Sequence, residues 1–150
     1  MKIGLSACLV GIKCRYNGYA CSEELTNLNL TKLDYYPFCP ELLGGLPTPR
    51  SPLEIQGQII TNSYDDLSQG LIKVVDNLGQ DYSQAMIVGA RKTVELLKQY
   101  QITEVILKDK SPSCGYQVIY DGSFSGQLIA GQGILAALLV KEGFKIQNTG

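Results

Sequence analysis

Cysteines placed in turns are the feature of this sequence that most restricts its fold. Cys8, Cys14, Cys39 and Cys114 all stand in segments punctuated by glycine or proline, and three of these segments follow short apolar runs typical of strands. A free cysteine usually behaves as a small buried hydrophobe inside a regular element. Thiols that gather instead in turns at the same end of several strands point to a shared metal ion or cluster. The fold must therefore bring distant strand ends together.

Short apolar runs alternate with helical patterns along the chain. Strands are predicted over 2–7, 34–38, 58–61, 103–108 and 144–147, and helices over 23–30, 65–78, 83–100 and 134–142. The glycines and prolines of 41–55 predict a shaped loop. Asp121-Gly122 predicts a hairpin over 119–126, whose register the nearby Ser125-Gly126 leaves open. This order predicts one α/β domain over 1–150, a three-layer structure with a small mostly parallel sheet flanked by helices. The cysteine-bearing loops then fall at the carboxyl ends of strands, where ligands bind in such sheets.

The overall composition narrows the class of protein. Thirteen basic and fourteen acidic residues give a net charge of −1, which lacks the positive field needed to bind polymeric nucleic acid. No apolar stretch is long enough to span a membrane, and the apolar run at the N-terminus is too short for a signal peptide. We therefore expect a cytoplasmic protein whose five cysteines serve metal or catalytic chemistry rather than disulfides.

The chain contains no histidine, which removes the commonest general base and the commonest zinc ligand. Thiolates are soft ligands that suit an iron-sulfur cluster or zinc better than magnesium or calcium. The intervals between the cysteines match neither a zinc ribbon nor a ferredoxin, so ordinary unliganded thiols stay open as the alternative. Cys21, at the start of a predicted helix, is interpreted as such an ordinary thiol.

Two charged residues near Cys39 are candidates for chemistry. Glu41 opens a glycine-rich loop and could act as acid or base, or else as an N-cap that accepts hydrogen bonds from the amides of Leu43 and Gly44. Arg50 could bind an anionic or carbonyl group of a substrate through its planar guanidinium. The alternative is that it pins a loop, for example through Glu54.

The segment around Cys114 offers two hydroxyl groups. Ser111 and Ser113 flank a proline, where they could orient a water or a substrate heteroatom, or could simply form the turn. Asp109 and Lys110 of the same segment could also reach the rim of the site. Gly131 and Gly133 precede a predicted helix, which is a weak signal for phosphate binding. No complete nucleotide-binding motif is present in the sequence.

Four segments of the sequence, 6–18, 39–55, 108–115 and 120–139, resemble in order the domain-of-unknown-function family 523 (DUF523), which includes thiouracil desulfurase. The resemblance implies a compact α/β domain that holds an oxygen-sensitive [4Fe-4S] cluster through three cysteines, with one iron open to the sulfur of a thiolated base. Matched by motif, the implied ligands are Cys8, Cys39 and Cys114.

The resemblance also implies an activity and roles for other residues. Glu41 is the implied proton-transfer residue, assisted by Ser111 or Ser113, while Cys14 and Arg50 are candidates for contact with the substrate. The implied reaction is a non-redox, hydrolytic replacement of sulfur by oxygen in a small thiouracil-like heterocycle. Whether Cys14 ligates the cluster, shields it or contacts substrate stays open. The rival hypotheses are a non-catalytic zinc or iron-sulfur binding module and an accessory interaction domain.

Overall fold

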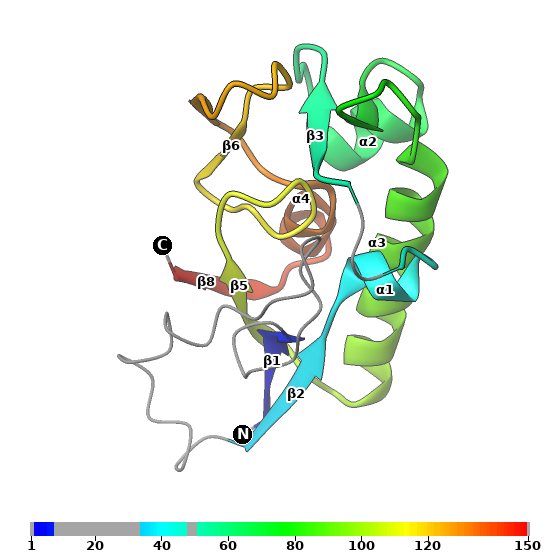
Figure 1. Ribbon diagram of the computed structural model, residues 1–150. Coiled ribbons are helices and arrows are strands. Elements are labelled where there is room, and N and C mark those ends of the chain that lie inside the picture. The colour runs from blue at the N-terminus through cyan, green and yellow to red at the C-terminus, as the bar shows by residue number, and fades with distance from the viewer. Residues whose placement is uncertain (1, 8–33, 48–50, 150) are drawn as a thin grey trace.

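The computed structural model describes residues 2–7, 34–47 and 51–149. Within these ranges, four parallel strands form the central sheet in the order β2-β1-β5-β8 (Figure 1). The strands are β1 (Lys2–Ser6), β2 (Asp34–Phe38), β5 (Glu104–Lys108) and β8 (Lys145–Thr149). The predicted α/β fold with a small parallel sheet is confirmed. The predicted helix over 23–30 lies outside the described residues.

β2 lies at one edge of this sheet. Its Pro37 is in register with Leu5 of β1, and an edge strand tolerates proline because one of its sides needs no amide donor. β1 and β5 are central, and the side chains of Leu5, Val105 and Leu107 are fully buried. Burial of an aliphatic side chain of this size stabilises the fold by roughly 1.5–3 kcal/mol. Parallel pairing also brings the carboxyl ends of β1, β2 and β5 to one edge of the sheet.

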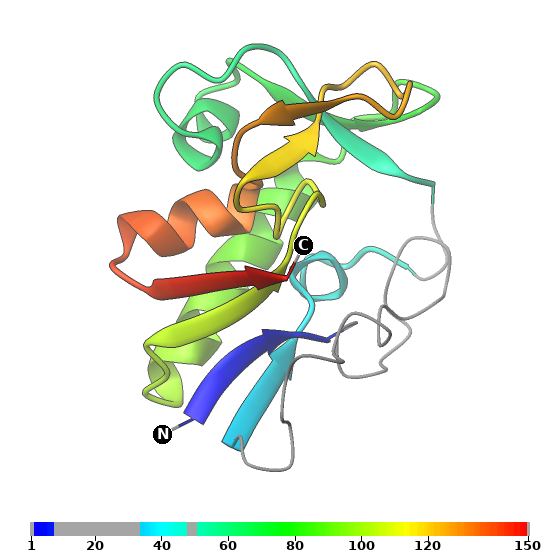
Figure 2. The same ribbon diagram turned by 90° about the vertical axis from the view of Figure 1, so that its left-hand side faces the viewer.

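Two helices build the core against the sheet. They are α3 (Ser83–Gln99) and α4 (Ile134–Lys141), which lie side by side in both views (Figure 2). The helical spacing of Met86, Ala90 and Val94 predicts one apolar face of α3, and all three side chains are buried. Both predicted helices, over 83–100 and 134–142, are therefore confirmed to within about one residue at each end.

Two antiparallel strand pairs complete the described fold. One pairs β3 (Leu53–Gln56) with β4 (Lys73–Asp76), and the other pairs β6 (Val118–Tyr120) with β7 (Leu128–Ala130). The Gln56 side-chain amide donates to the carbonyl of Gly122 at 2.9 Å, which joins the first pair to the turn that follows β6. Figure 2 shows both pairs above the parallel sheet. β3 and β6 contribute to the wall of a cavity at the carboxyl ends of the parallel strands.

The prediction of one helix over 65–78 is wrong. The segment forms a short helix, α2 (Ser63–Ser68), then turns at Gly70, where φ is +79°, and continues as β4. Pairing with β3 buries Val74 and Val75, whereas Leu71 and Leu78, which the helical pattern placed on the apolar face, are exposed. A non-local strand pairing therefore overrides the local helical spacing.

Three further predictions need correction. The segment 41–55 is not entirely loop, because it contains most of α1 (Pro40–Leu43) and the start of β3. Residues 58–61 form no strand. The hairpin is formed, but its strands are joined by a seven-residue turn over 121–127 rather than a two-residue Asp-Gly turn, and it closes through a hydrogen bond from the amide of Asp121 to the carbonyl of Gln127 at 3.0 Å.

Candidate active site

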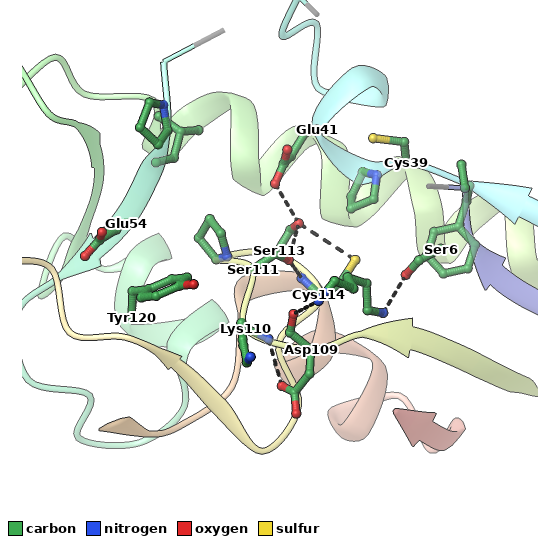
Figure 3. Close-up of a pocket in the computed structure, with 17 residues that line it drawn as sticks. Ser6, Cys39, Glu41, Glu54, Asp109, Lys110, Ser111, Ser113, Cys114 and Tyr120 are labelled. Carbon is green, nitrogen blue, oxygen red and sulfur yellow. Dashed lines mark hydrogen bonds between the residues drawn. The ribbon is translucent and has the colours of Figure 1, made fainter. Parts of the chain in front are cut away.

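A cavity of about 250 Å³ lies at the carboxyl ends of the parallel strands (Figure 3). Its wall is built from the ends of β1, β2 and β5, from α1, from the segment 109–114, and from parts of β3 and β6. Of the predicted site residues, the described ones all line this cavity: Cys39, Glu41, Ser111, Ser113 and Cys114. Cys8, Cys14 and Arg50 lie outside the described residues, as does Cys21.

α1 carries two of these residues, and its position is set by close backbone packing. Cys39 is the N-cap residue and Pro40 occupies the first helical turn, where its missing amide hydrogen has no cost. A Cβ atom at Gly44 would lie 2.2 Å from the carbonyl oxygen of Ala85 on α3, and one at Gly89 of α3 would lie 1.9 Å from the carbonyl oxygen of Pro40. Only glycine at both positions allows this approach, which fixes α1 on α3.

The segment around Cys114 is held by the buried carboxylate of Asp109. Its Oδ1 accepts hydrogen bonds from the amides of Lys110 and Tyr116, both at 2.9 Å, and from two neighbouring amides at 3.3 and 3.4 Å. Ser111 Oγ accepts a further hydrogen bond from the amide of Cys114 at 2.7 Å. These contacts close the segment into a compact ring with Cys114 on its inner side, facing the cavity.

The N-terminus of α4 packs directly on this same segment. The amide of Ile134 donates to the carbonyl of Pro112 at 2.8 Å, and the amide of Ala136 donates to the carbonyl of Ser113 at 3.1 Å. Gly133 is required here, since a Cβ atom would lie 2.6 Å from Ser113 backbone atoms. Two amides at the start of α4 are thus engaged within the fold, which counts against the weak phosphate signal of Gly131 and Gly133.

A short chain of hydroxyl groups leads to Glu41. Ser113 Oγ donates to Glu41 Oε1 at 3.0 Å, and the hydroxyls of Ser111 and Ser113 are 3.3 Å apart. Because each hydroxyl has one proton, this order makes Ser111 the donor to Ser113 and Ser113 the donor to Glu41. The interpretation of Glu41 as an N-cap is wrong, because the amides of Leu43 and Gly44 donate to backbone carbonyls instead.

The two described thiols fit the donor set of an iron-sulfur or zinc site. Cys39 is partly buried, Cys114 is 5% exposed, and neither forms a disulfide. Both line the cavity, as does Ala7, which precedes Cys8 in the sequence. Ser113 Oγ lies 3.8 Å from Cys114 Sγ, so the hydroxyl chain also reaches a thiol. Soft ligands facing one cavity from separate loops are the arrangement that such metal centres require.

Several contacts that shape the site were not predicted from the sequence. Ser6 Oγ accepts a hydrogen bond from the amide of Lys108 at 3.0 Å and so ties the ends of β1 and β5 together. The carboxylate of Asp109 orders the cysteine segment, and Glu54 and Tyr120 line the far wall of the cavity. These roles depend on contacts between residues distant in sequence, and no local motif signals them.

Two carboxyl groups outside the cavity have lowered pKa values. A hydrogen bond from Lys141 lowers the pKa of Asp65, and one from Ser83 lowers the pKa of Asp81. None of the helices in the described residues is both long and apolar enough to cross a membrane.

The model of the 2-thiouracil desulfurase family matches residues 3–149, nearly the whole chain. The chain belongs to this family. The uncharacterized protein YbbK of Bacillus subtilis strain 168 is 43% identical over 143 residues, which cover 95% of this chain and 91% of YbbK. A solved structure, described as the [4Fe-4S]-dependent thiouracil desulfidase TudS, is similar with a TM-score of 0.79. It is 35% identical, and the match covers 98% of this chain and 89% of that one.

These comparisons confirm the resemblance to DUF523 and the predicted type of enzyme, a thiouracil desulfurase. They also agree with the α/β fold observed here.

Proposed function

We propose that this chain, acting as a single domain over residues 1–150, removes the sulfur of a small thiouracil-like heterocycle and replaces it with oxygen from water. The observation that carries this proposal is the meeting of two thiols, a carboxylate and a serine hydroxyl in one cavity: Cys39, Cys114, Glu41 and Ser113. The family match and the description of TudS as a [4Fe-4S]-dependent thiouracil desulfidase support it.

A [4Fe-4S] cluster is the proposed cofactor, held by Cys39 and Cys114 together with Cys8. Cluster ligands are cysteine thiolates, and both described thiols face the cavity with their sulfur atoms free of disulfides. Held by these three cysteines, such a cluster would supply Lewis-acid chemistry toward the thiocarbonyl sulfur of the substrate. Cys14 and Arg50 are proposed to contact the substrate.

Glu41 is proposed as the general base. Its Oε1 accepts a hydrogen bond from Ser113 Oγ at 3.0 Å, which orients the carboxylate, and the carboxylate takes a proton from the attacking water. Ser111 supports Ser113 at 3.3 Å and can replace the proton that Ser113 shares. Protonated Glu41 then returns the proton to the departing sulfur through the same hydroxyl chain.

The proposed net reaction is balanced without electron transfer. The carbon–sulfur double bond of the substrate and one water give a carbon–oxygen double bond and one hydrogen sulfide. Both protons of water end on sulfur or in solution, and the substrate carbon keeps its oxidation state. The residues of the cavity therefore need to move protons only, a task for which carboxylate and hydroxyl groups are sufficient.

The test uses protein purified and reconstituted with iron and sulfide under anaerobic conditions. The proposal predicts conversion of 2-thiouracil to uracil with release of one sulfide. Glu41→Gln should keep the iron and acid-labile sulfide content but lower kcat by roughly 10²–10⁴-fold, the usual contribution of a general base. A non-catalytic iron-sulfur or zinc module would bind metal in both proteins and convert substrate in neither, and that outcome would overturn the proposal.

A further inference from the structure

The end of the cavity away from the thiols carries three polar side chains that the proposed chemistry does not use. They are Glu54 on β3, Lys110 after β5, and Tyr120 at the end of β6. The same three residues also line a small recess that adjoins the cavity beside Pro112. In Figure 3, Glu54 and Tyr120 lie on one side of Ser113, and Cys39 and Ser6 lie on the other.

Glu54 is a buried carboxylate with one oxygen in use. Glu54 is only 8% exposed, and its Oε1 accepts hydrogen bonds from the amides of Gly122 at 2.9 Å and Phe124 at 3.2 Å. Within the part of the chain that the structure describes, Oε2 forms no hydrogen bond or ion pair. A buried carboxylate oxygen without a partner is costly, so this atom is a ready acceptor for a ligand that enters the cavity.

Tyr120 and Lys110 supply the complementary donors. Neither the Tyr120 hydroxyl nor the Lys110 ammonium has a hydrogen-bond partner among residues 2–7, 34–47 and 51–149. Lys110 also has a φ of +76°, an unfavourable conformation for lysine that is held by the hydrogen bond from its amide to Asp109. This backbone conformation and the pairing of Lys110 with Ile119 keep Lys110 beside β6.

We propose that Glu54, Lys110 and Tyr120 form the subsite that recognises the ring of the substrate. Glu54 Oε2 accepts a ring N–H, and Tyr120 and Lys110 donate to the adjacent ring carbonyl oxygen. 2-Thiouracil presents this pair of groups at N3 and C4. The inference rests on the proposed function for the identity of the ring, and it assigns the subsite to cyclic N–H and carbonyl groups rather than to sulfur.

The subsite determines specificity, because a buried site built to hydrogen-bond a polar group rejects analogues that lack it. Pyrimidine-2-thione carries the thiocarbonyl sulfur but lacks the C4 oxygen. We expect the wild-type ratio of kcat/KM for 2-thiouracil over pyrimidine-2-thione to fall roughly 10- to 100-fold in Tyr120→Phe and in Lys110→Met, as expected for loss of one or more hydrogen bonds. The fall should come from KM for 2-thiouracil more than from kcat.

Matched variants separate recognition from folding. Glu54→Gln keeps an oxygen for the amides of Gly122 and Phe124 but replaces the second acceptor with an NH₂ group. Tyr82→Phe is the control, because it removes a hydroxyl that hydrogen-bonds Gln80 on the exposed surface. It should leave the specificity ratio within about threefold of wild type, a change smaller than one hydrogen bond.

Equilibrium binding of uracil, measured by calorimetry on the anaerobic reconstituted protein, tests the subsite without any desulfuration. Wild type and Tyr82→Phe should bind uracil, and Glu54→Gln, Tyr120→Phe and Lys110→Met should bind it at least roughly tenfold more weakly. Equal binding by all proteins, or no binding by wild type, overturns the subsite. Absence of turnover of 2-thiouracil overturns the proposed function instead, and the uracil result still decides the subsite.

Discussion

Replacing Gly89 by alanine tests how the fold positions the site. Gly89 lies on α3, and its missing side chain leaves room for the Pro40 carbonyl at the start of α1. A Cβ atom there would lie 1.9 Å from the Pro40 oxygen, whereas ordinary contact begins near 3.4 Å. The oxygen must therefore retreat by roughly 1.5 Å, and because the obstacle is backbone, no side-chain rotation can relieve it. α1, with Cys39 and Glu41, has to move with it.

Gly89→Ala should lower the activity far more than the stability of the protein. Overpacking costs about 1–3 kcal/mol, and alanine returns up to about 1 kcal/mol through its higher helix propensity. For a chain of this length the net loss, at most about 3 kcal/mol, lowers Tm by at most about 12 °C. A catalytic group displaced by about 1 Å loses about a hundredfold in rate, so kcat/KM for 2-thiouracil should fall at least that far in Gly89→Ala.

Gly4→Ala is the matched control. A Cβ atom at Gly4 would meet the side chains of Val105 at 2.9 Å and Leu97 at 3.0 Å, which can yield by small rotations. Thermal unfolding and steady-state turnover of both variants, reconstituted in parallel, should show a similar loss of Tm but a large loss of activity only in Gly89→Ala. Full activity in a folded Gly89→Ala protein would refute the reasoning that the α1–α3 contact positions the site.

Two further substitutions test the hydrogen bonds of the cysteine segment. Asp109→Ala should destabilise the fold by about 2–4 kcal/mol, because it leaves loop amides unpaired, and should also abolish reconstitution of the cluster. Asp76→Ala is the control, because it likewise removes a buried carboxylate from two backbone amides. It should lower Tm but leave the iron content unchanged. Equal iron content in the two variants would contradict a positioning role for Asp109. Ser113→Ala should leave iron content unchanged and lower kcat by about tenfold or more, because it removes the hydroxyl bonded to Glu41; an unchanged kcat would remove Ser113 from the proton path.

Local patterns in the sequence were sufficient for much of the central fold. The strand that ends before Cys39 and the one that ends before Cys114 each combine a short apolar run with glycine or proline punctuation, and both were predicted within about two residues of their bounds. The long helix α3 is predicted from its periodic apolar residues alone. The carboxyl-end rule for parallel sheets then predicts that Cys39 and Cys114 share a cavity, as observed.

Non-local contacts explain what the sequence could not reveal. Val74 and Val75 fit a helical face and a strand equally well, and only pairing with β3 decides between them. Asp109 resembles an ordinary turn residue until four amides are found around its carboxylate. Glu54 and Tyr120 belong to strands that meet only in the folded chain, so no motif in either segment predicts their shared cavity.

The central claim is that cavity residues direct water to the thiocarbonyl carbon of the substrate. It is tested most directly by mass spectrometry of the product formed from 2-thiouracil in ¹⁸O-labelled water by the anaerobically reconstituted protein. The account predicts uracil that carries one ¹⁸O atom, with one sulfide released for each uracil formed. Uracil without the label, or release of sulfide without uracil, would contradict it.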